Sequence, residues 1–205
     1  PESTKYFDKS KVVVVRLPLR PGILSAKSKE LFTRRKKTLL VMGGKLGAHV
    51  INQFIFNNLS QLLMSFNIVH QTGTSSVTGD YDRALSLQNT LGSLSDCYIP
   101  LGYITEGEIG EYLRSADFYF GRSGAHICYE QGIIGLPGIL VPLMSTHDRE
   151  QHKNAEILVG AKIASILAQG KLTLANFINA YTIIKEIKPT PMSLPVHAST
   201  LLVDD

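Results

Sequence analysis

The 205-residue chain is long enough for one domain with appended segments and too short for two large domains. Hydrophobic residues make up 44% and charged residues 19%, which excludes a disordered tail, and no apolar run reaches the roughly 18 residues of a membrane-spanning helix. The net charge of +4 is uneven, because residues 1–37 hold eleven Lys or Arg and three Asp or Glu while the remainder is net acidic.

The basic first segment, with its run Arg34–Lys37, permits two interpretations. Clustered positive charge favours phosphate-rich partners or an acidic membrane face, whereas a solvated linker has the same composition. The segment lacks the interleaved aromatic and basic residues of nucleic-acid recognition, so we expect no nucleic-acid partner. Two cysteines, Cys97 and Cys128, are too few for a disulfide scaffold or a zinc cluster, and we expect both to be packed in a core in a reducing, cytoplasmic setting.

Short apolar runs rich in branched residues alternate with segments of helical periodicity. We expect strands over Val12–Val15, Thr38–Met42, Asn67–His70, Phe118–Phe120, Ile139–Val141 and Ala164–Leu167. We expect helices over Ala48–Met64, Glu106–Arg114, His126–Gly132, Glu150–Val159 and Leu172–Ile187. The strands are apolar throughout, which is typical of strands buried on both faces. The series predicts an α/β fold, a Rossmann-like open parallel sheet with helices on both faces.

The pattern divides the chain into three parts. Residues 1–24 are expected to be the end of a preceding domain and a linker, 25–188 the α/β domain, and 189–205 an extension leading to a truncated final helix. The chain begins at Pro1 rather than Met and stops in an apolar stretch. We therefore expect it to be a piece of a longer protein.

The glycine-rich segment Gly43–Ala48 directly follows a predicted buried strand and opens a long helix. Glycines allow a sharp turn and the close approach of an anion, and the helix N-terminus offers free N–H groups, so the segment suits a diphosphate. Glycines that serve helix–strand packing give the same pattern. The segment is not a P-loop, because no Gly-Lys-Ser/Thr closes it.

The segment Arg122–Ala125 repeats this arrangement after a second strand, and Glu130 follows one to two turns into the next helix. A carboxylate there can accept two hydrogen bonds from a vicinal diol such as a ribose, whereas the alternative is an ordinary surface glutamate. His126 at the helix start suits either a phosphate or a local cap.

A third polar loop, within Val141–Ala155, leads into a helix that starts with many hydrogen-bonding side chains. Such a group suits a sugar with many hydroxyls, although Asp148 as N-cap with Gln151 in a capping box explains the same residues. His147 and His152 are five residues apart, a poor spacing for one helical face, and we expect no metal.

These loops follow the carboxyl ends of parallel strands, the edge at which open α/β sheets bind ligands. The segment His70–Gly73 ends another strand and is a further candidate for the same cleft. A diphosphate, a diol and a polyol together describe a nucleotide sugar.

The order and spacing of Ala116–Ala125, Glu130, Gly135–Pro137 and Asp148–Ala155 resemble the C-terminal half of the bacterial N-acetylglucosaminyltransferases that use UDP-GlcNAc and lipid I in peptidoglycan synthesis. These are two-domain GT-B enzymes of glycosyltransferase family 28. The resemblance covers about residues 10–170. It implies that residues 25–188 are the donor-binding half of an inverting transferase that converts lipid I to lipid II. It also implies that the catalytic residues lie in the other half, with none in this chain.

The resemblance implies the donor contacts residue by residue. The diphosphate is assigned to Gly44, Lys45 and the helix start after Gly47, and Arg20 reaches the donor from the linker. The ribose is assigned to Glu130, the uracil to Tyr103 and the backbone of Ile104, and the GlcNAc hydroxyls to Glu150 and Gln151. The remaining substrate-binding residues that the resemblance implies are Arg122, Ser123, Gly124, Ala125 and Asn154.

The sequence departs from the family at a few of these positions. Lys45-Leu46 replaces the usual Ser-Gln pair, and Glu150 stands where Gln or His is usual. No cofactor or metal is implied, because UDP-GlcNAc is a substrate. The implied partners are UDP-GlcNAc and a lipid-linked acceptor bound by the other half, with weak or indirect membrane contact for this chain. The implied location is cytoplasmic, at the inner face of the cell membrane.

Three other functions remain as alternatives. The chain is a stand-alone UDP-sugar-binding subunit that needs a separate acceptor partner, a UDP-GlcNAc 2-epimerase on the same fold, or an α/β domain with a purely structural role. The epimerase requires additional charged catalytic residues that this sequence lacks.

Overall fold

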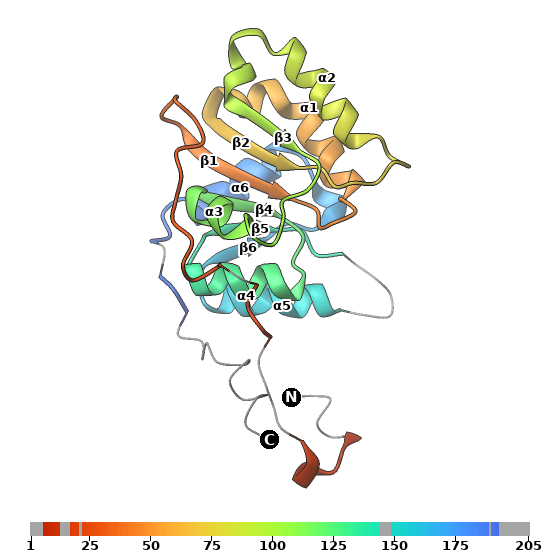
Figure 1. The fold of residues 1–205 in the computed structure, drawn as a ribbon, viewed down its shortest axis with the longest axis vertical. Helices are drawn as coiled ribbons and strands as arrows, with labels where there is room; N and C mark the ends of the chain where they lie inside the picture. Colours follow the sequence, from red (N-terminus) through yellow and green to blue (C-terminus); the bar gives the residue numbers. More distant parts are fainter. Residues whose placement is uncertain (1–5, 13–16, 21, 144–148, 189, 193–205) are drawn as a thin grey trace.

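The computed structural model describes residues 6–12, 17–20, 22–143, 149–188 and 190–192. Its centre is a six-stranded sheet in the order β3-β2-β1-β4-β5-β6, in which every pairing is parallel (Figure 1). The strands are β1 (Lys37–Met42), β2 (Phe66–Gln71), β3 (Tyr98–Leu101), β4 (Phe118–Gly121), β5 (Gly138–Leu140) and β6 (Ala164–Ile166). This order is that of a doubly wound Rossmann sheet, which confirms the predicted fold.

Helices cover both faces of the sheet. They are α1 (His49–Ser65), α2 (Asp80–Thr90), α3 (Ile109–Ser115), α4 (Ala125–Ile134), α5 (Glu150–Gly160) and α6 (Leu174–Ile184), with short 3-10 helices η2 (Lys9–Lys11), η3 (Gly92–Cys97) and η4 (Gln169–Lys171). One hydrophobic cluster joins the sheet to α1, α2 and α6, and a second joins it to α3, α4 and α5. The helices α4 and α5 lie side by side at one end of the molecule (Figure 1).

The strand β1 shows why the sequence pattern was informative. Leu39 and Val41 belong to the first cluster, whereas Leu40 and Met42 belong to the second. Alternate side chains therefore enter opposite cores, and both faces of the strand need apolar residues. The first core is rich in aromatic contacts, with Phe120 5.5 Å from Phe54 and 5.1 Å from Phe177 between ring centroids.

The elements β1, β2, β4, β5 and β6 confirm the strands expected there, and helices are present in all five expected regions. The sequence reading missed β3 and α2. The strand β3 lies at the sheet edge, where Pro100 is tolerated, and the 11-residue helix α2 is mostly polar with two buried residues. Of the strand expected over residues 12–15, Val12 is extended outside any strand and residues 13–16 lie outside the described residues, as does most of 189–205, where a final helix was expected.

The chain connections place the helix ends at defined edges of the sheet. Since α1, α4 and α5 follow the carboxyl ends of β1, β4 and β5, their N-termini lie at the carboxyl edge, and the helix C-termini lie at the amino edge. Among the helices of the described ranges, none has the length and apolar character needed to cross a bilayer.

Candidate functional site

A cavity of about 330 Å³ lies at the carboxyl edge of the sheet. The loops after β1, β3 and β4, the end of β2, the first turns of α4 and α5, and the linker before the sheet all contribute to it. Nine of the fourteen residues predicted to bind substrate line this cavity: Arg20, Gly44, Lys45, Tyr103, Ile104, Arg122, Gly124, Ala125 and Gln151. Segments that the sequence could only place at separate strand ends therefore meet at one site.

The glycines of the loop after β1 serve both roles considered for them, since one lines the cavity and another allows close packing. Gly44 and Lys45 line the cavity. Gly47 is instead packed against the end of β2, where a Cβ on Gly47 would lie 2.0 Å from the carbonyl oxygen of Thr72. Gly47 (φ +85°) and Gly73 (φ +93°) approach each other so closely that neither position has room for a side chain. Packing therefore explains Gly47, whereas Gly44 and Lys45 of the same loop line the cavity.

Three helix N-termini at this edge have no side-chain cap. The N-cap residues of α1, α4 and α5 are Ala48, Gly124 and Arg149, and none accepts a hydrogen bond from the first turn through its side chain. By contrast, Thr173 caps α6 by accepting from the N–H of Asn176. Uncapped first turns leave backbone donors and the positive end of the helix dipole available to an anion. The predicted cap Asp148 lies outside the described residues.

Glu130 is fully buried, which excludes the interpretation as a surface glutamate. Both of its carboxylate oxygens accept hydrogen bonds from Arg20, with 2.7 Å between Arg20 Nε and Glu130 Oε1. The Arg20 side chain is 18% exposed and forms part of the cavity wall. Burial lowers the pKa of Arg20, but its hydrogen bond and charge attraction to Glu130 outweigh burial and raise it. Glu130 itself does not line the cavity, and a ribose diol that reached it would share these oxygens with Arg20.

Gln71, the last residue of β2, lies between the loops after β1 and β3. Its Nε2 donates to the carbonyl of Gly44 at 3.0 Å, and its Oε1 accepts from the N–H of Ile104 at 3.1 Å. The N–H of Ile104, part of the backbone expected to read a base edge, is thus paired with Gln71 in this structure. Tyr103 beside it is 39% exposed and lines the cavity. The sequence had pointed to the segment His70–Gly73 and, separately, to Gly44 and Ile104, but not to the hydrogen bonds by which Gln71 joins them.

His70, the residue before Gln71, does not face this cavity. It is fully buried on the α1 side of the sheet, where its ring nitrogens lie 2.9 Å from the Tyr98 hydroxyl and 3.0 Å from Asn52 Oδ1. The Asn52 amide in turn donates to Asp80 and to the carbonyl of Thr72. Burial lowers the pKa of His70 to about 3, against the weaker attraction of Asp80, so His70 is a neutral structural residue.

The loop after β4 is tied to α5 by its predicted substrate residues. The buried Ser123 donates through Oγ to the carbonyl of Gln151 at 2.8 Å, and its own carbonyl accepts from Asn154 at 3.2 Å. Gln151 Oε1 accepts from the N–H of Leu143 at 3.0 Å, which ties its side chain to the loop after β5, and the capping box predicted with Asp148 lies outside the described residues. Ser123 and Asn154 do not line the cavity, and neither does the exposed Glu150.

Arg122 lines the cavity, but the partners of its guanidinium do not. Its guanidinium donates to the carbonyl of Val141 at 3.0 Å and to Gln169 Oε1 at 2.7 Å. Burial lowers the pKa of Arg122. Lys45 also lines the cavity with an exposed side chain, and among the described residues neither Lys45 nor Arg122 has a carboxylate partner.

The two cysteines are packed in the core. Cys97 and Cys128 are both buried, as predicted, and burial raises the pKa of the Cys128 thiol to about 12, which makes it a poor nucleophile. Within the ranges described, no three Cys, His, Asp or Glu side chains gather into a possible metal site. His152 lies 3.4 Å from Glu156 one turn later in α5, and His147 is outside the described residues.

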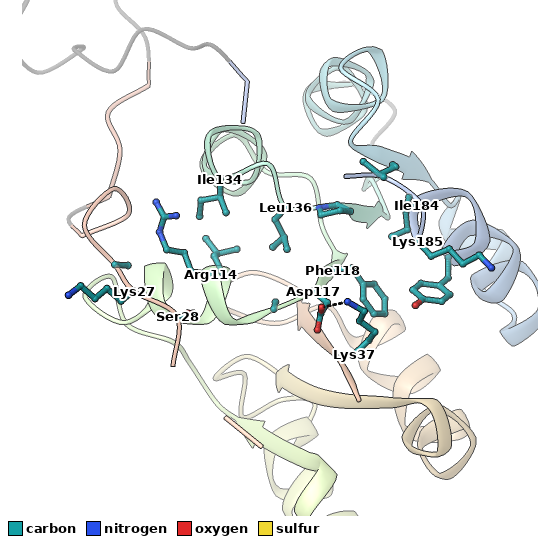
Figure 2. Close-up of a pocket in the computed structure, with 16 residues that line it drawn as sticks. Lys27, Ser28, Lys37, Arg114, Asp117, Phe118, Ile134, Leu136, Ile184 and Lys185 are labelled. Atoms are coloured by element: carbon teal, nitrogen blue, oxygen red, sulfur yellow. Dashed lines mark hydrogen bonds and ion pairs between the residues drawn. The ribbon is translucent and has the colours of Figure 1, made fainter. Parts of the chain in front are cut away.

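A second and larger cavity of about 750 Å³ lies at the opposite, amino edge (Figure 2). Apolar side chains that include Phe118, Leu136 and Ile184 line part of it, and Arg114 and Lys185 lie on opposite sides (Figure 2). None of the residues predicted to bind substrate lines this second cavity.

Comparison with known proteins identifies the family. The model of the glycosyltransferase family 28 C-terminal domain matches residues 38–193. A relative from Bacillus cereus is 32% identical over 183 residues, which cover 86% of this chain and 49% of the relative. One from Clostridium botulinum (strain Loch Maree) is 30% identical over 178 residues, 84% of this chain and 47% of the relative. Both are named UDP-N-acetylglucosamine–N-acetylmuramyl-(pentapeptide) pyrophosphoryl-undecaprenol N-acetylglucosamine transferase, and the chain spans about half their length.

Solved structures support the fold. MurG of Acinetobacter baumannii superposes with a TM-score of 0.64 at 23% identity, over 84% of this chain and 49% of that protein. The calicheamicin glycosyltransferase CalG4 gives a TM-score of 0.60 at 19% identity, over 90% of this chain and 41% of that protein. With the family match over more than half of its length, this chain belongs to glycosyltransferase family 28, as a C-terminal domain of that family.

Proposed function

We propose that this chain is the UDP-GlcNAc-binding half of an inverting N-acetylglucosaminyltransferase that acts on lipid I to form lipid II. The observation that carries the proposal is the cavity at the carboxyl edge. It brings nine predicted donor contacts together next to the buried carboxylate of Glu130 and three uncapped helix N-termini. The relatives' names specify UDP-N-acetylglucosamine as donor and an undecaprenol-linked acceptor.

The donor is expected to lie along the cavity in a defined order. The uracil packs on Tyr103, and the ribose hydroxyls donate to Glu130, where the carboxylate already holds Arg20. The diphosphate lies over Gly44 and Lys45 and faces the first turn of α4. The amide NH₂ of Gln151 is directed to the sugar, because its carbonyl oxygen is taken by Leu143. In this arrangement the diphosphate, the hydroxyls and the uracil ring of the donor each contact a residue of complementary chemistry.

The chemistry of transfer needs stabilisation of negative charge on the leaving diphosphate. In an inverting transfer, an acceptor hydroxyl attacks the anomeric carbon, the C1–O bond to UDP breaks, and the hydroxyl proton passes to a base. Backbone N–H groups and helix dipoles fixed before the reaction stabilise such charge without reorganisation, and Lys45 adds a full positive charge. The acceptor and the base are assigned to the remainder of a full-length protein, since this chain spans about half the length of its relatives.

The same division sets the proposed partners and location. An undecaprenol-linked acceptor is a lipid, so the full-length enzyme is expected to work at the inner face of the cell membrane. The acceptor-binding half is expected to make the main membrane contact, with weak contact through this chain.

Calorimetric titration of the chain with UDP-GlcNAc, UDP and ADP, without added metal, tests the proposal. We expect UDP and UDP-GlcNAc to bind and ADP to bind far more weakly, because Tyr103 and Ile104 shape the base end of the cavity. Absence of uridine-nucleotide binding both to this chain and to a protein with the upstream half restored would contradict it. Binding by this chain, with transfer only after a separately produced acceptor half is added, would identify the stand-alone subunit.

A further inference from the structure

Gln71 is a buried amide at the centre of the candidate site. Its side chain comes from the end of β2, which lies between β1 and β3, and the residue is 1% exposed. The loop after β1 carries Gly44 and Lys45, and the loop after β3 carries Tyr103 and Ile104. Gln71 therefore lies between the loop assigned to the diphosphate and the loop assigned to the base.

The two ends of this amide make different bonds. Nε2 donates to the Gly44 carbonyl at 3.0 Å, and Oε1 accepts from the Ile104 N–H at 3.1 Å. One loop thus presents an acceptor and the other a donor, and an amide satisfies both at once. A carboxylate would lack the donor, and an apolar side chain would leave the Gly44 carbonyl and the buried Ile104 N–H without these partners.

The backbone next to Gln71 joins the same two loops. The N–H of Thr72 donates to Leu101 at 2.9 Å and that of Gly73 to Gly102 at 3.0 Å, while the N–H of Thr74 donates to the carbonyl of Lys45 at 3.1 Å. These bonds lie along the chain after β2, and the Gln71 side chain adds a link at the cavity wall itself. The end of β2 therefore holds both loops in one relative position.

We propose that Gln71 is a positioning residue that couples recognition of the base to recognition of the diphosphate. This inference rests on the proposed function, because it takes the cavity to bind a uridine nucleotide. Gln71 fixes the carbonyl of Gly44 on one side, so the remaining polar groups of that loop face the phosphates. On the other side it fixes Ile104, which sets the position of Tyr103. The distance between the base contact and the β-phosphate contact is thereby preset.

The test compares UDP with UMP, which lacks the β-phosphate, in calorimetric titrations of three variants. Gln71→Met removes both hydrogen bonds at similar volume, and we expect UDP affinity to fall roughly 10- to 100-fold. Gln71→Glu keeps the acceptor for Ile104 but removes the donor to Gly44. We therefore expect UMP affinity to stay within about threefold of wild type while the preference for UDP over UMP decreases about tenfold.

Thr72→Val is the matched control. Thr72 is also buried at the end of β2, and its hydroxyl donates to Leu101 at 3.2 Å, on the base side and without contact to Gly44. We expect its ratio of UDP to UMP affinity to equal that of wild type. Thermal unfolding of each variant separates loss of folding from loss of coupling, and if Gln71→Met does not fold, the shorter neutral amide of Gln71→Asn takes its place.

The outcomes separate the two proposals. Failure of the wild-type chain to bind UDP contradicts the proposed function. Normal UDP binding by wild type, with an unchanged UDP to UMP ratio in Gln71→Glu or with unchanged or tighter UDP binding in Gln71→Met, overturns the role of Gln71. A decreased ratio of UDP to UMP affinity in both Gln71→Met and Gln71→Glu, with Thr72→Val like wild type, supports it, because repulsion between an added carboxylate and the β-phosphate cannot act in the neutral Gln71→Met.

Discussion

The two edges of the parallel sheet each carry a cavity, and helix ends of opposite partial charge lie at the two edges. At the carboxyl edge, the helices α1, α4 and α5 begin without side-chain caps, so free N–H groups supply positive potential. At the amino edge the helices end, and cations are placed there: Lys36 donates to the carbonyl of Leu63 in the last turn of α1, Arg114 lies in the last turn of α3, and Lys185 caps α6. The C-terminal end of a helix carries a partial negative charge, which explains why these Lys and Arg residues lie at the amino edge.

This contrast also bears on the basic first segment. Lys29 forms an ion pair with Glu111 at 2.8 Å, Lys37 with Asp117 at 2.6 Å, and Lys36 contacts the end of α1. Part of the charge that suggested an anionic partner is therefore balanced within the protein. Positive charge in a sequence does not by itself locate an anion site, because Lys29, Lys36 and Lys37 have partners within the protein.

The largest expected difference between the edges is the loss of stability when a Cβ atom is added to a glycine. Gly73→Ala places a methyl group about where the backbone of Gly47 lies, 2.2 Å from its nitrogen, at a φ of +93°. We expect the free energy of unfolding to fall by roughly 3 kcal/mol or more. Gly160→Ala at the amino-edge end of α5 is the control, since nothing lies within 4 Å of its Cβ. Urea denaturation that shows equal stability for both variants would refute the close packing of the loop.

The second difference is acid sensitivity near the carboxyl edge. His70 has a pKa of about 3 in the folded protein, below the 6.5 of an exposed histidine, so the unfolded chain takes up the proton first as the pH falls. The contribution of neutral His70 is complete above about pH 6.5 and is lost towards pH 3, at about 1.4 kcal/mol per pH unit. His70→Gln should remove this dependence between pH 6.5 and 4.5, as measured by denaturation at several pH values. An identical pH dependence in the variant and the wild type would argue against the buried neutral imidazole.

The third comparison concerns binding. Glu130→Gln replaces the buried carboxylate with a neutral amide of the same shape and removes a charge-assisted acceptor. We expect UDP affinity to decrease roughly 10- to 150-fold, which corresponds to about 1.5–3 kcal/mol. Asp117→Asn at the amino edge should leave it unchanged, because Asp117 belongs to the other cavity. Equal effects of the two substitutions in calorimetry would remove Glu130 from the site.

The smallest effect is expected at the amino edge. Lys37 and Asp117 form an ion pair whose side chains are 65% and 36% exposed, and such pairs typically contribute about 0–1 kcal/mol. Lys37→Met should change the free energy of unfolding by less than about 1 kcal/mol and leave UDP affinity as in wild type. A thermal shift as large as that of Gly73→Ala would show that this edge is more tightly coupled to the core than its exposure indicates.

Local patterns made most of the fold and much of the candidate site predictable. Apolar runs such as Thr38–Met42 have buried faces on both sides, and a glycine-rich turn after such a strand identifies the edge on which the loop lies. The edge strand β3 and the polar helix α2 were not predicted, because their residues bury little apolar surface and the hydrophobic periodicity is therefore weak. The assignment of individual donor contacts stays a prediction until titration.

The sequence by itself determined the parallel α/β architecture, the carboxyl-edge loops and the resemblance to family 28, because each depends on residues close together in the chain. Tertiary structure alone decided the partners of Glu130 and Gln71. Arg20 and Glu130 are 110 residues apart, and Gln71 bridges Gly44 and Ile104 across 27 and 33 residues. It also turned His70 away from the cavity and Gln71 into it. Successive side chains of a strand point to opposite faces, and only the packed sheet determines which face meets the cavity.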